Sequence, residues 1–379
     1  MNNSTNKCVL LLHILLEMKN RILGLIALTG FILGIQSCKE EITSNEAFIE
    51  TAVVYGLLDV ADTMHMIKIT RAFIGDGVMN SNLIAGNPDS SYFQSVTGTV
   101  TEYINSIPAR VFTLSDTTVL NKDEDGIFYA PTQKLYYFTT DAGSPLNGDA
   151  EYRLDLDINN GEFQVSAQTV MVNSMQETTS DNNVPFSFVQ SNGTILNRPV
   201  SVNTGTASRV NCTLEVDFTE FVGSDSTIKS FQWNLGELDV ENNNTHEFQA
   251  KGQLFYDKIK SNVTNNSAIT KRNLNGIRFV VTGGSQDLTS YILINQPSSS
   301  LAQTKPSFTN LEATNGHPVV GVFTSTQTLN YYVPFVGGSN FIRCISTSST
   351  EHLCNGPQTF DLLFCSNHPG DALKTWFCP

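Results

Sequence analysis

The chain has 379 residues, of which 40% are hydrophobic and 15% are charged, and its net charge at pH 7 is −14. The hydrophobic content argues against a disordered chain. The acidic balance argues against nonspecific nucleic-acid binding, because lysine and arginine are needed to displace phosphate counterions. The length suits two domains of about 150 residues, each able to bury a core.

An apolar run of about 14 residues, 22–35, follows Lys19 and Arg21 near the N-terminus. A transmembrane helix needs about 20 residues, whereas the core of a secretory signal needs about 7–15. The run ends in Ile35-Gln36-Ser37-Cys38, the layout of a bacterial lipoprotein signal, with the small Ser37 before the cysteine. The sequence therefore predicts removal of residues 1–37 and acylation of Cys38, whose acyl chains would hold the protein to a membrane.

Met18 stands directly before Lys19-Asn20-Arg21 and is predicted to be the true start of translation. Removal of residues 1–37 takes away three basic residues and Glu17, which lowers the net charge from −14 to −16. The alternative interpretation of the apolar run is a retained membrane anchor. Residues 38–49 are predicted to be a polar tether.

Residues 50–172 show a succession of short strand patterns. The segment 65–70 places Ile67 and Ile69 on one face. Apolar residues also alternate from Tyr152 to Ile158 and continue from Phe163 to Ala167, on either side of Asn159-Asn160-Gly161. Period-2 alternation indicates half-buried strands, and Asn-Gly sequences favour the positive φ angles of a tight hairpin turn. We predict an immunoglobulin-like β-sandwich for residues 50–172.

Residues 173–379 are predicted to form a second β-rich domain with a short helix. Its first part, 173–208, is rich in Asn, Ser and Thr and is interpreted as a linker or a long excursion. Strands are expected near 212–218, 277–282 and 291–294. Phe255, Ile259 and Val263 recur every four residues, so the segment 252–263 is expected to be a helix that packs on a β-sheet, with a partner-binding helix as the alternative.

The segment Asn121-Lys122-Asp123-Glu124-Asp125-Gly126 matches the first half of a calcium-binding loop. Asn121, Asp123 and Asp125 would supply oxygen ligands, and the glycine would permit the sharp turn around the ion. Thr132 stands where a bidentate glutamate is expected. The alternative is a solvated hairpin turn between Leu120 and Ile127.

Five cysteines remain besides Cys38 in the predicted mature chain, and four of them are in the tail: Cys344, Cys354, Cys365 and Cys378. Clustered cysteines outside the cytoplasm favour disulfides, and four allow three pairings. Free thiols are one alternative. A zinc site is another, because Cys365-x-x-His368 has the spacing of metal ligands. Cys212 is predicted to be a buried strand residue.

No motif of nucleophilic, metalloprotease or nucleotide-dependent catalysis is present in the sequence. We therefore expect no cofactor and predict that the protein is not an enzyme. A sugar-binding site would need exposed aromatic rings, and the candidates are Trp233, Trp376, Tyr136, Tyr137, Tyr331 and Tyr332. Their strand-like surroundings favour the core or its rim instead.

Several segments of the mature chain together resemble a known family. They are Ala52-Val53-Val54-Tyr55-Gly56, the hairpin 152–167, Gly276-Ile277-Arg278-Phe279, Tyr291-Ile292-Leu293-Ile294-Asn295, Phe308-Thr309-Asn310-Leu311, Gly321-Val322-Phe323, and a tail with Cys365 and Trp376. The chain resembles the Bacteroidetes lipoproteins grouped as domain-of-unknown-function family 4249. Lys39-Glu40-Glu41 is also similar to the acidic signal that sends Bacteroidetes lipoproteins to the cell surface. The tail differs from the family pattern because Cys378 follows Trp376 and a close cysteine pair near residue 365 is missing.

The resemblance implies a surface lipoprotein of the outer membrane that works beside a TonB-dependent transporter. The leading expectation is therefore a noncatalytic envelope protein that binds a ligand or partner. The alternatives are a glycan-binding surface lipoprotein and a surface hydrolase. The hydrolase would need two carboxylates, or a serine and a histidine, converging in a cleft.

Overall fold

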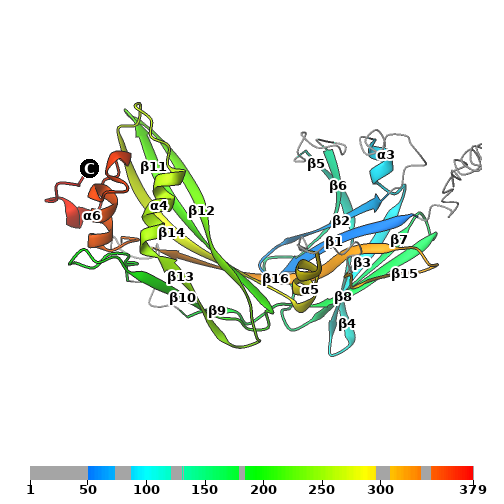
Figure 1. The fold of residues 1–379 in the computed structure, drawn as a ribbon. Coiled ribbons are helices and arrows are strands. Elements are labelled where there is room, and N and C mark those ends of the chain that lie inside the picture. The colour runs from blue at the N-terminus through cyan, green and yellow to red at the C-terminus, as the bar shows by residue number, and fades with distance from the viewer. Residues whose placement is uncertain are drawn as a thin grey trace, which may run out of the picture. The chain divides into compact units, whose positions relative to one another are not determined.

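The computed structural model describes residues 50–72, 87–120, 130, 132–178, 184–295, 308–333 and 343–378. These residues are mostly β-structure in three sheets, with short helices (Figure 1). The predicted mostly-β class is confirmed. Within these ranges, no helix has both the length and the apolar character needed to span a membrane.

The largest sheet has eight strands in the order β12-β11-β14-β16-β1-β2-β6-β5, the next has five in the order β15-β8-β7-β3-β4, and the smallest has the order β13-β10-β9. In chain order the strands are β1 (Thr51–Asp59), β2 (Met64–Ala72), β3 (Val96–Ile104), β4 (Ile107–Thr113), β5 (Ser115–Leu120), β6 (Thr132–Thr139), β7 (Glu151–Ile158), β8 (Phe163–Val170), β9 (Gln176–Glu177), β10 (Asn197–Asn203), β11 (Arg209–Val222), β12 (Asp225–Asp239), β13 (Thr245–Lys251), β14 (Lys271–Gly284), β15 (Leu311–Ala313) and β16 (Val319–Val333). The helices are α3 (Pro88–Ser91), α4 (Gly252–Asn262), α5 (Gln286–Asn295) and α6 (Thr347–Asn355), and two 3₁₀ turns are η1 (Phe360–Leu362) and η2 (Pro369–Asp371).

The first core lies between the five-stranded sheet and the strands β1, β2, β6 and β16 of the large sheet. The β7–β8 hairpin supplies much of it, because the alternating apolar residues of 152–158 and 163–167 are buried as predicted. The turn residues Asn159, Asn160 and Gly161 have φ angles of 51°, 58° and 93°. Ile67 and Ile69 of β2 face the same core, also as predicted.

The second core is built on β11 and β14, which contain the predicted strands 212–218 and 277–282. Every second residue of β11 from Val210 to Phe218 is buried. The predicted helix is confirmed as α4, whose Phe255 and Ile259 are buried in this core together with Val263 just after it. The α4 helix is therefore packed on a β-sheet.

Strand β16 takes part in both cores. Its first half pairs with β1 in parallel and its second half pairs with β14 antiparallel, and Thr326 lies in both registers. Phe323 belongs to the first core, whereas Tyr331 belongs to the second. Gly321 is required in this strand because its φ is 114° and a Cβ atom there would lie 1.9 Å from the Val54 carbonyl oxygen.

The predicted strand at 291–294 is wrong, because these residues belong to helix α5. A run of four apolar residues fits a buried strand or a helix equally well, so its period cannot decide between them. The start of the helix decides the matter here. The Ser285 carbonyl oxygen accepts a hydrogen bond from the Thr289 amide at 3.0 Å, and Asp287 lies in the first turn, where a negative charge is favourable.

Within the segment 173–208, the described residues 173–178 and 184–208 pack into the folded body. Phe186, Phe188, Val200 and Val202 are buried in the second core. Met171 belongs to the first core and Val172 belongs to the second. Leu311 and Phe323, much later in the chain, belong to the first core again. The predicted division into domains 50–172 and 173–379 stays a prediction.

Candidate interaction surface

The outward side of β1 is apolar, although the inward side already supplies the core. Ala52, Val54 and Leu58 point inward and are buried. Tyr55 and Leu57 point outward, with 37% and 48% of their surface exposed. A strand that covers a core normally carries polar residues on its solvent side, so this strand departs from the usual pattern.

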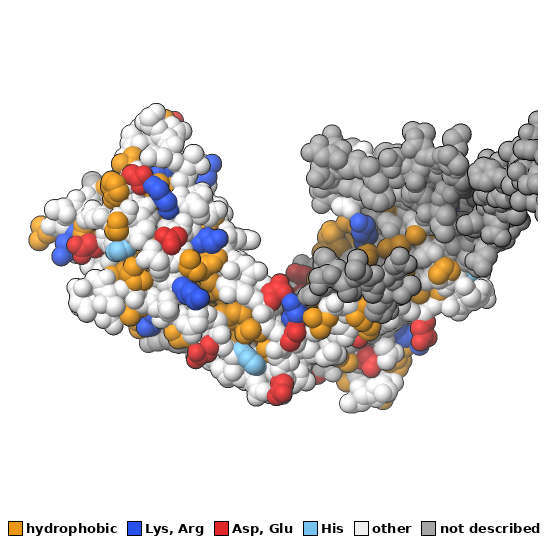
Figure 2. Space-filling model, viewed as in Figure 1, with side chains coloured by type: hydrophobic (Ala, Val, Ile, Leu, Met, Phe, Trp, Pro, Cys, Tyr) orange, Lys and Arg blue, Asp and Glu red, His pale blue; other side chains and the backbone are white. Residues whose placement is uncertain are grey.

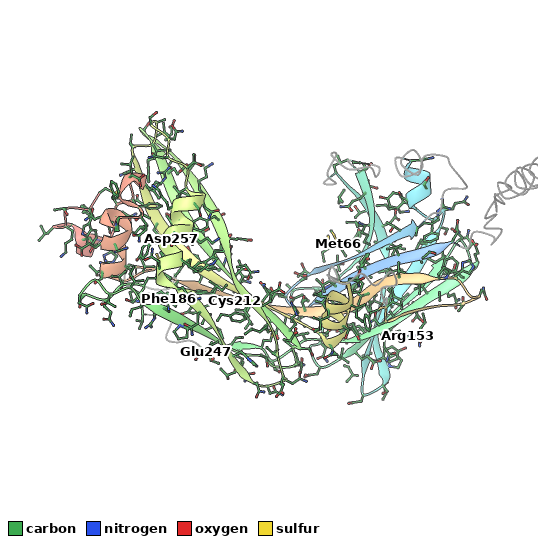
Figure 3. All side chains as sticks on the ribbon, in the orientation of Figure 1. Met66, Arg153, Phe186, Cys212, Glu247 and Asp257 are labelled. Atoms are coloured by element: carbon green, nitrogen blue, oxygen red, sulfur yellow. A yellow bond between two sulfur atoms is a disulfide. The ribbon has the colours of Figure 1, made fainter. Side chains whose placement is uncertain are left out.

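The neighbouring strand β2 extends this apolar surface. Met64 and Met66 are 48% and 41% exposed, and Met66 pairs with Tyr137 of β6. On the other side of β1, the exposed Val320 of β16 pairs with Val53. We call Tyr55, Leu57, Met64, Met66 and Val320 the apolar face. Figure 2 shows hydrophobic side chains gathered over β1 and β2, and Figure 3 labels Met66 among them.

Helix α5 covers the part of this sheet that lies next to the apolar face. Ser285 and Thr324 hydroxyls are 2.6 Å apart, and Thr324 is buried. The Tyr291 hydroxyl of α5 lies 2.8 Å from the Tyr55 hydroxyl, and the two rings meet edge to face at 5.9 Å. Burial and this hydrogen bond raise the pKa of Tyr55 to about 12. The helix therefore fixes one border of the apolar face.

This arrangement suits contact with another protein. Large contiguous patches of exposed apolar surface on soluble proteins often mark interaction sites. Tyrosine and methionine are enriched in protein interfaces, because they bury a large area and adapt to the partner. Sequence analysis missed this surface, although one signal was available: β1 is apolar at both alternating sets of positions.

Two groups of predicted site residues lie outside the described residues. These are the lipidation site Cys38 and the calcium-loop residues Asn121, Asp123 and Asp125. The flanking strands β5 and β6 are antiparallel partners, from Ser115 opposite Tyr137 to Leu120 opposite Thr132. Both predictions stay predictions.

The four cysteines of the tail are not equivalent in the structure. Cys365 and Cys378 form a disulfide with a Cα–Cα distance of 5.6 Å, while Cys344 and Cys354 are free and buried. Burial raises the pKa of each free thiol to about 12, so both are protonated at neutral pH. The disulfide also occupies Cys365, one half of the suggested zinc pair. His368, the other half, accepts a hydrogen bond at Nδ1 from the Gly370 amide at 3.0 Å.

The residues considered for an aromatic sugar platform lie mostly in the two cores. Trp233, Trp376, Tyr136 and Tyr331 are all buried. Cys212, predicted to be buried on a strand, is also fully buried, and burial raises the pKa of its thiol to about 12. These side chains stabilise the fold and do not present a flat ring surface to a ligand.

Two buried carboxylates of the first half of the chain are held by neighbouring groups. Burial raises the pKa of Asp59, whose Oδ1 accepts a hydrogen bond from the Ala61 amide at 3.0 Å. Glu102 accepts hydrogen bonds from the Arg110 guanidinium and the Tyr152 hydroxyl. Asp59 lies at the end of β1, and Glu102 forms an ion pair with Arg110. Both carboxylates therefore stabilise the local structure.

No family model matches the chain, and no curated protein matches it. Among solved structures it is similar to the C-terminal globular domain of an oligosaccharyltransferase from Pyrococcus abyssi, with 11% identity and a TM-score of 0.22 over 61% of this chain. The chain spans 45% of the length of that structure. A likeness at this level carries no argument about function.

Proposed function

We propose that this protein is a noncatalytic, lipid-anchored protein of the outer membrane that binds a partner protein through the apolar face. The partner we propose is a TonB-dependent transporter, for which this protein would act as an accessory. The observation that carries the proposal is the apolar face itself, where the three adjacent strands β16, β1 and β2 turn apolar side chains outward.

The position of the apolar face along the chain favours a partner held in the same membrane. Thr51, the first residue of β1, comes 13 residues after Cys38. Even a fully extended chain of that length reaches about 45 Å. Acylation of Cys38 would thus keep β1 close to the membrane, within reach of the exposed parts of a membrane protein.

The charge of the protein favours a protein partner over the lipid surface. The predicted mature chain carries a net charge of −16, and acidic chains are repelled by anionic membrane surfaces. Lys68, which pairs with Tyr55, is the basic residue nearest to the centre of the apolar face in the β1–β2 register. An apolar, tyrosine-containing surface without a basic cluster fits a protein interface better than a headgroup layer.

We also propose that the first core belongs to an immunoglobulin-like sandwich. Tyr152 lies near the start of β7, and its hydroxyl accepts a hydrogen bond from the amide of Asn147, five residues upstream, at 2.7 Å. This arrangement is similar to the tyrosine corner of immunoglobulin-like domains. The resemblance to family 4249 supports the same fold and the same cellular location.

The anchoring part of the proposal is tested by Cys38→Ala. Without the cysteine no acyl chain can be attached, so the variant should leave the membrane fraction and appear in the soluble fraction. Cell fractionation and mass spectrometry of the N-terminal peptide would measure this. If the variant stays with the membranes, the lipoprotein assignment is wrong.

The partner-binding part is tested by affinity purification of the tagged full chain from outer membranes in mild detergent. We expect a TonB-dependent transporter in near-equal amount with the wild-type protein and its loss with Leu57→Asp/Met66→Asp. Each aspartate would cost about 2 kcal/mol or more when buried against an apolar partner.

A matched control is available on the other sheet. Ile107 and Val111 of β4 are 67% and 62% exposed, so Ile107→Asp/Val111→Asp makes the same chemical change away from the apolar face. This control should keep the partner. A wild-type protein that purifies alone, or equal recovery of the transporter with both double variants, would refute the proposed function.

A further inference from the structure

The outer side of the five-stranded sheet carries an open hollow of about 630 Å³. It crosses the three central strands β3, β7 and β8, on the side of this sheet that faces away from the first core. Its polar lining residues are Thr97, Thr99, Thr113, Arg153, Asp155, Asp157, Gln164, Ser166 and Thr314. We call this hollow the polar groove.

The side chains of the polar groove form two rows across the strands. Thr99 pairs with Asp155, and Asp155 pairs with Ser166, so these three lie in register. Thr97, Asp157 and Gln164 form the next row in the same way. Neighbouring strands are about 4.8 Å apart, so each row presents its polar groups over about 10 Å across the three strands.

Backbone hydrogen bonds fix both ends of the polar groove. At one end, the Leu114 amide donates to the Gly98 carbonyl oxygen at 2.9 Å. At the other end, the Thr314 amide donates to the Gln164 carbonyl oxygen at 2.9 Å, and the Gln164 amide donates to the Thr314 hydroxyl at 2.8 Å. A ligand would therefore meet a formed surface and would not have to order it first.

Many polar atoms in the polar groove are available to a ligand. The side chains of Thr97, Thr99 and Ser166 make no hydrogen bond to the described residues. Arg153, which also lines the groove, pairs with Asp155 at 2.9 Å. Asp157 uses Oδ1 for the Gly161 amide at 2.7 Å, which leaves Oδ2 to accept further hydrogen bonds.

The chemistry of the lining selects one class of ligand. Two carboxylates against one guanidinium disfavour an anion, and the lining contains no aromatic ring on which a flat apolar ligand could stack. Closely spaced hydroxyl, amide and carboxylate groups match a ligand with many hydroxyl groups along its length. We propose that the polar groove binds a short, neutral oligosaccharide lying across the strands.

The proposal is tested by isothermal titration of the full chain in mild detergent with cellohexaose, maltohexaose and xylohexaose. Binding by hydrogen bonds without ring stacking should be saturable and weak, with a Kd of about 1 mM. Asp155→Asn/Asp157→Asn keeps the shapes of both side chains and removes both charges, and should weaken binding by about tenfold.

Gln168→Ala is the matched control, because Gln168 is an exposed outward residue of β8 that does not line the polar groove. It should leave the affinity unchanged. Circular dichroism and the melting temperature would show that each variant is folded. The proposal is overturned if none of the three sugars binds saturably. It is also overturned if the Asp155/Asp157 variant binds as tightly as the wild-type protein. Tighter binding of hexalysine than of the sugars would also overturn it and assign the groove to basic peptides.

Discussion

The apolar face and the polar groove lie on opposite outer sides of the same buried core, yet they differ completely in chemistry. Met66 marks the first and Arg153 the second, and both are labelled in Figure 3. On the inner sides, both sheets supply the same kind of residue, such as Ile67 and Leu154. The inner sides are constrained by packing, whereas each outer side is free to encode a different contact.

One leucine of β7, Leu154, and one leucine of β1, Leu57, allow the inner and outer sides of the sheets to be compared. Leu154 is fully buried and Leu57 is 48% exposed. We expect Leu154→Ala to lower the free energy of unfolding by about 2–5 kcal/mol, since it leaves a cavity in the core. Leu57→Ala should cost less than about 1 kcal/mol. Urea unfolding of both variants measures this, and similar losses would mean that the apolar face is part of the folded core.

The residue between the two exposed methionines of β2 gives a pH-dependent comparison. His65 is buried and stacks on Phe138 with a ring-centroid distance of 4.7 Å. Its pKa is lowered, chiefly because burial disfavours the charged ring, although the charge of Asp62 opposes this. A histidine whose folded pKa is lowered takes up its proton more readily in the unfolded state.

Stability should therefore fall as the pH drops below about 6.5, the ordinary pKa of histidine, and reach its full loss below the folded pKa. His65→Phe should show a smaller loss over the same pH range. Thermal melts from pH 8 to pH 5 would compare the two proteins. Parallel curves for both would show that His65 does not cause the pH dependence.

The smallest expected effect concerns the border of the apolar face. Tyr55→Phe keeps the ring contact with Tyr291 but removes the hydroxyl that lies 2.8 Å from the Tyr291 hydroxyl. Because both groups are partly exposed, the loss in unfolding free energy should be about 0.5–1 kcal/mol. Chemical denaturation can resolve such a change. A loss above about 2 kcal/mol would show that α5 depends on this pair far more than its geometry suggests.

Local patterns in the sequence predicted those elements whose apolar residues recur at a regular spacing. The β7–β8 hairpin is specified by alternation and by Asn159-Asn160-Gly161, and α4 by the fourfold spacing of Phe255 and Ile259. The α5 segment has no such clear period. Its assignment depended on Ser285 and Asp287 at the start of the helix, which outweigh the strand-like composition of 291–294.

The two candidate surfaces, the apolar face and the polar groove, depend on distant parts of the chain, which no local pattern contains. The border of the apolar face depends on the contact of Tyr55 with Tyr291 of α5, which lies more than 200 residues away in the chain. The polar groove needs Thr99 and Asp155 in register. The pairing of Cys365 with Cys378 likewise depends on the path of the tail beside Asn273, whose side-chain amide donates to the Cys365 carbonyl oxygen at 2.8 Å.

The parallel pairing of β1 with β16 has a consequence for the order of folding. Ala52 pairs with Val319, so one of the first strands to be synthesised must wait for one of the last. Contacts of such long sequence separation form slowly, because closing the intervening loop costs chain entropy. Until β16 arrives, one long edge of β1 is open to pairing with other chains, so protection of that edge by a chaperone would favour correct folding.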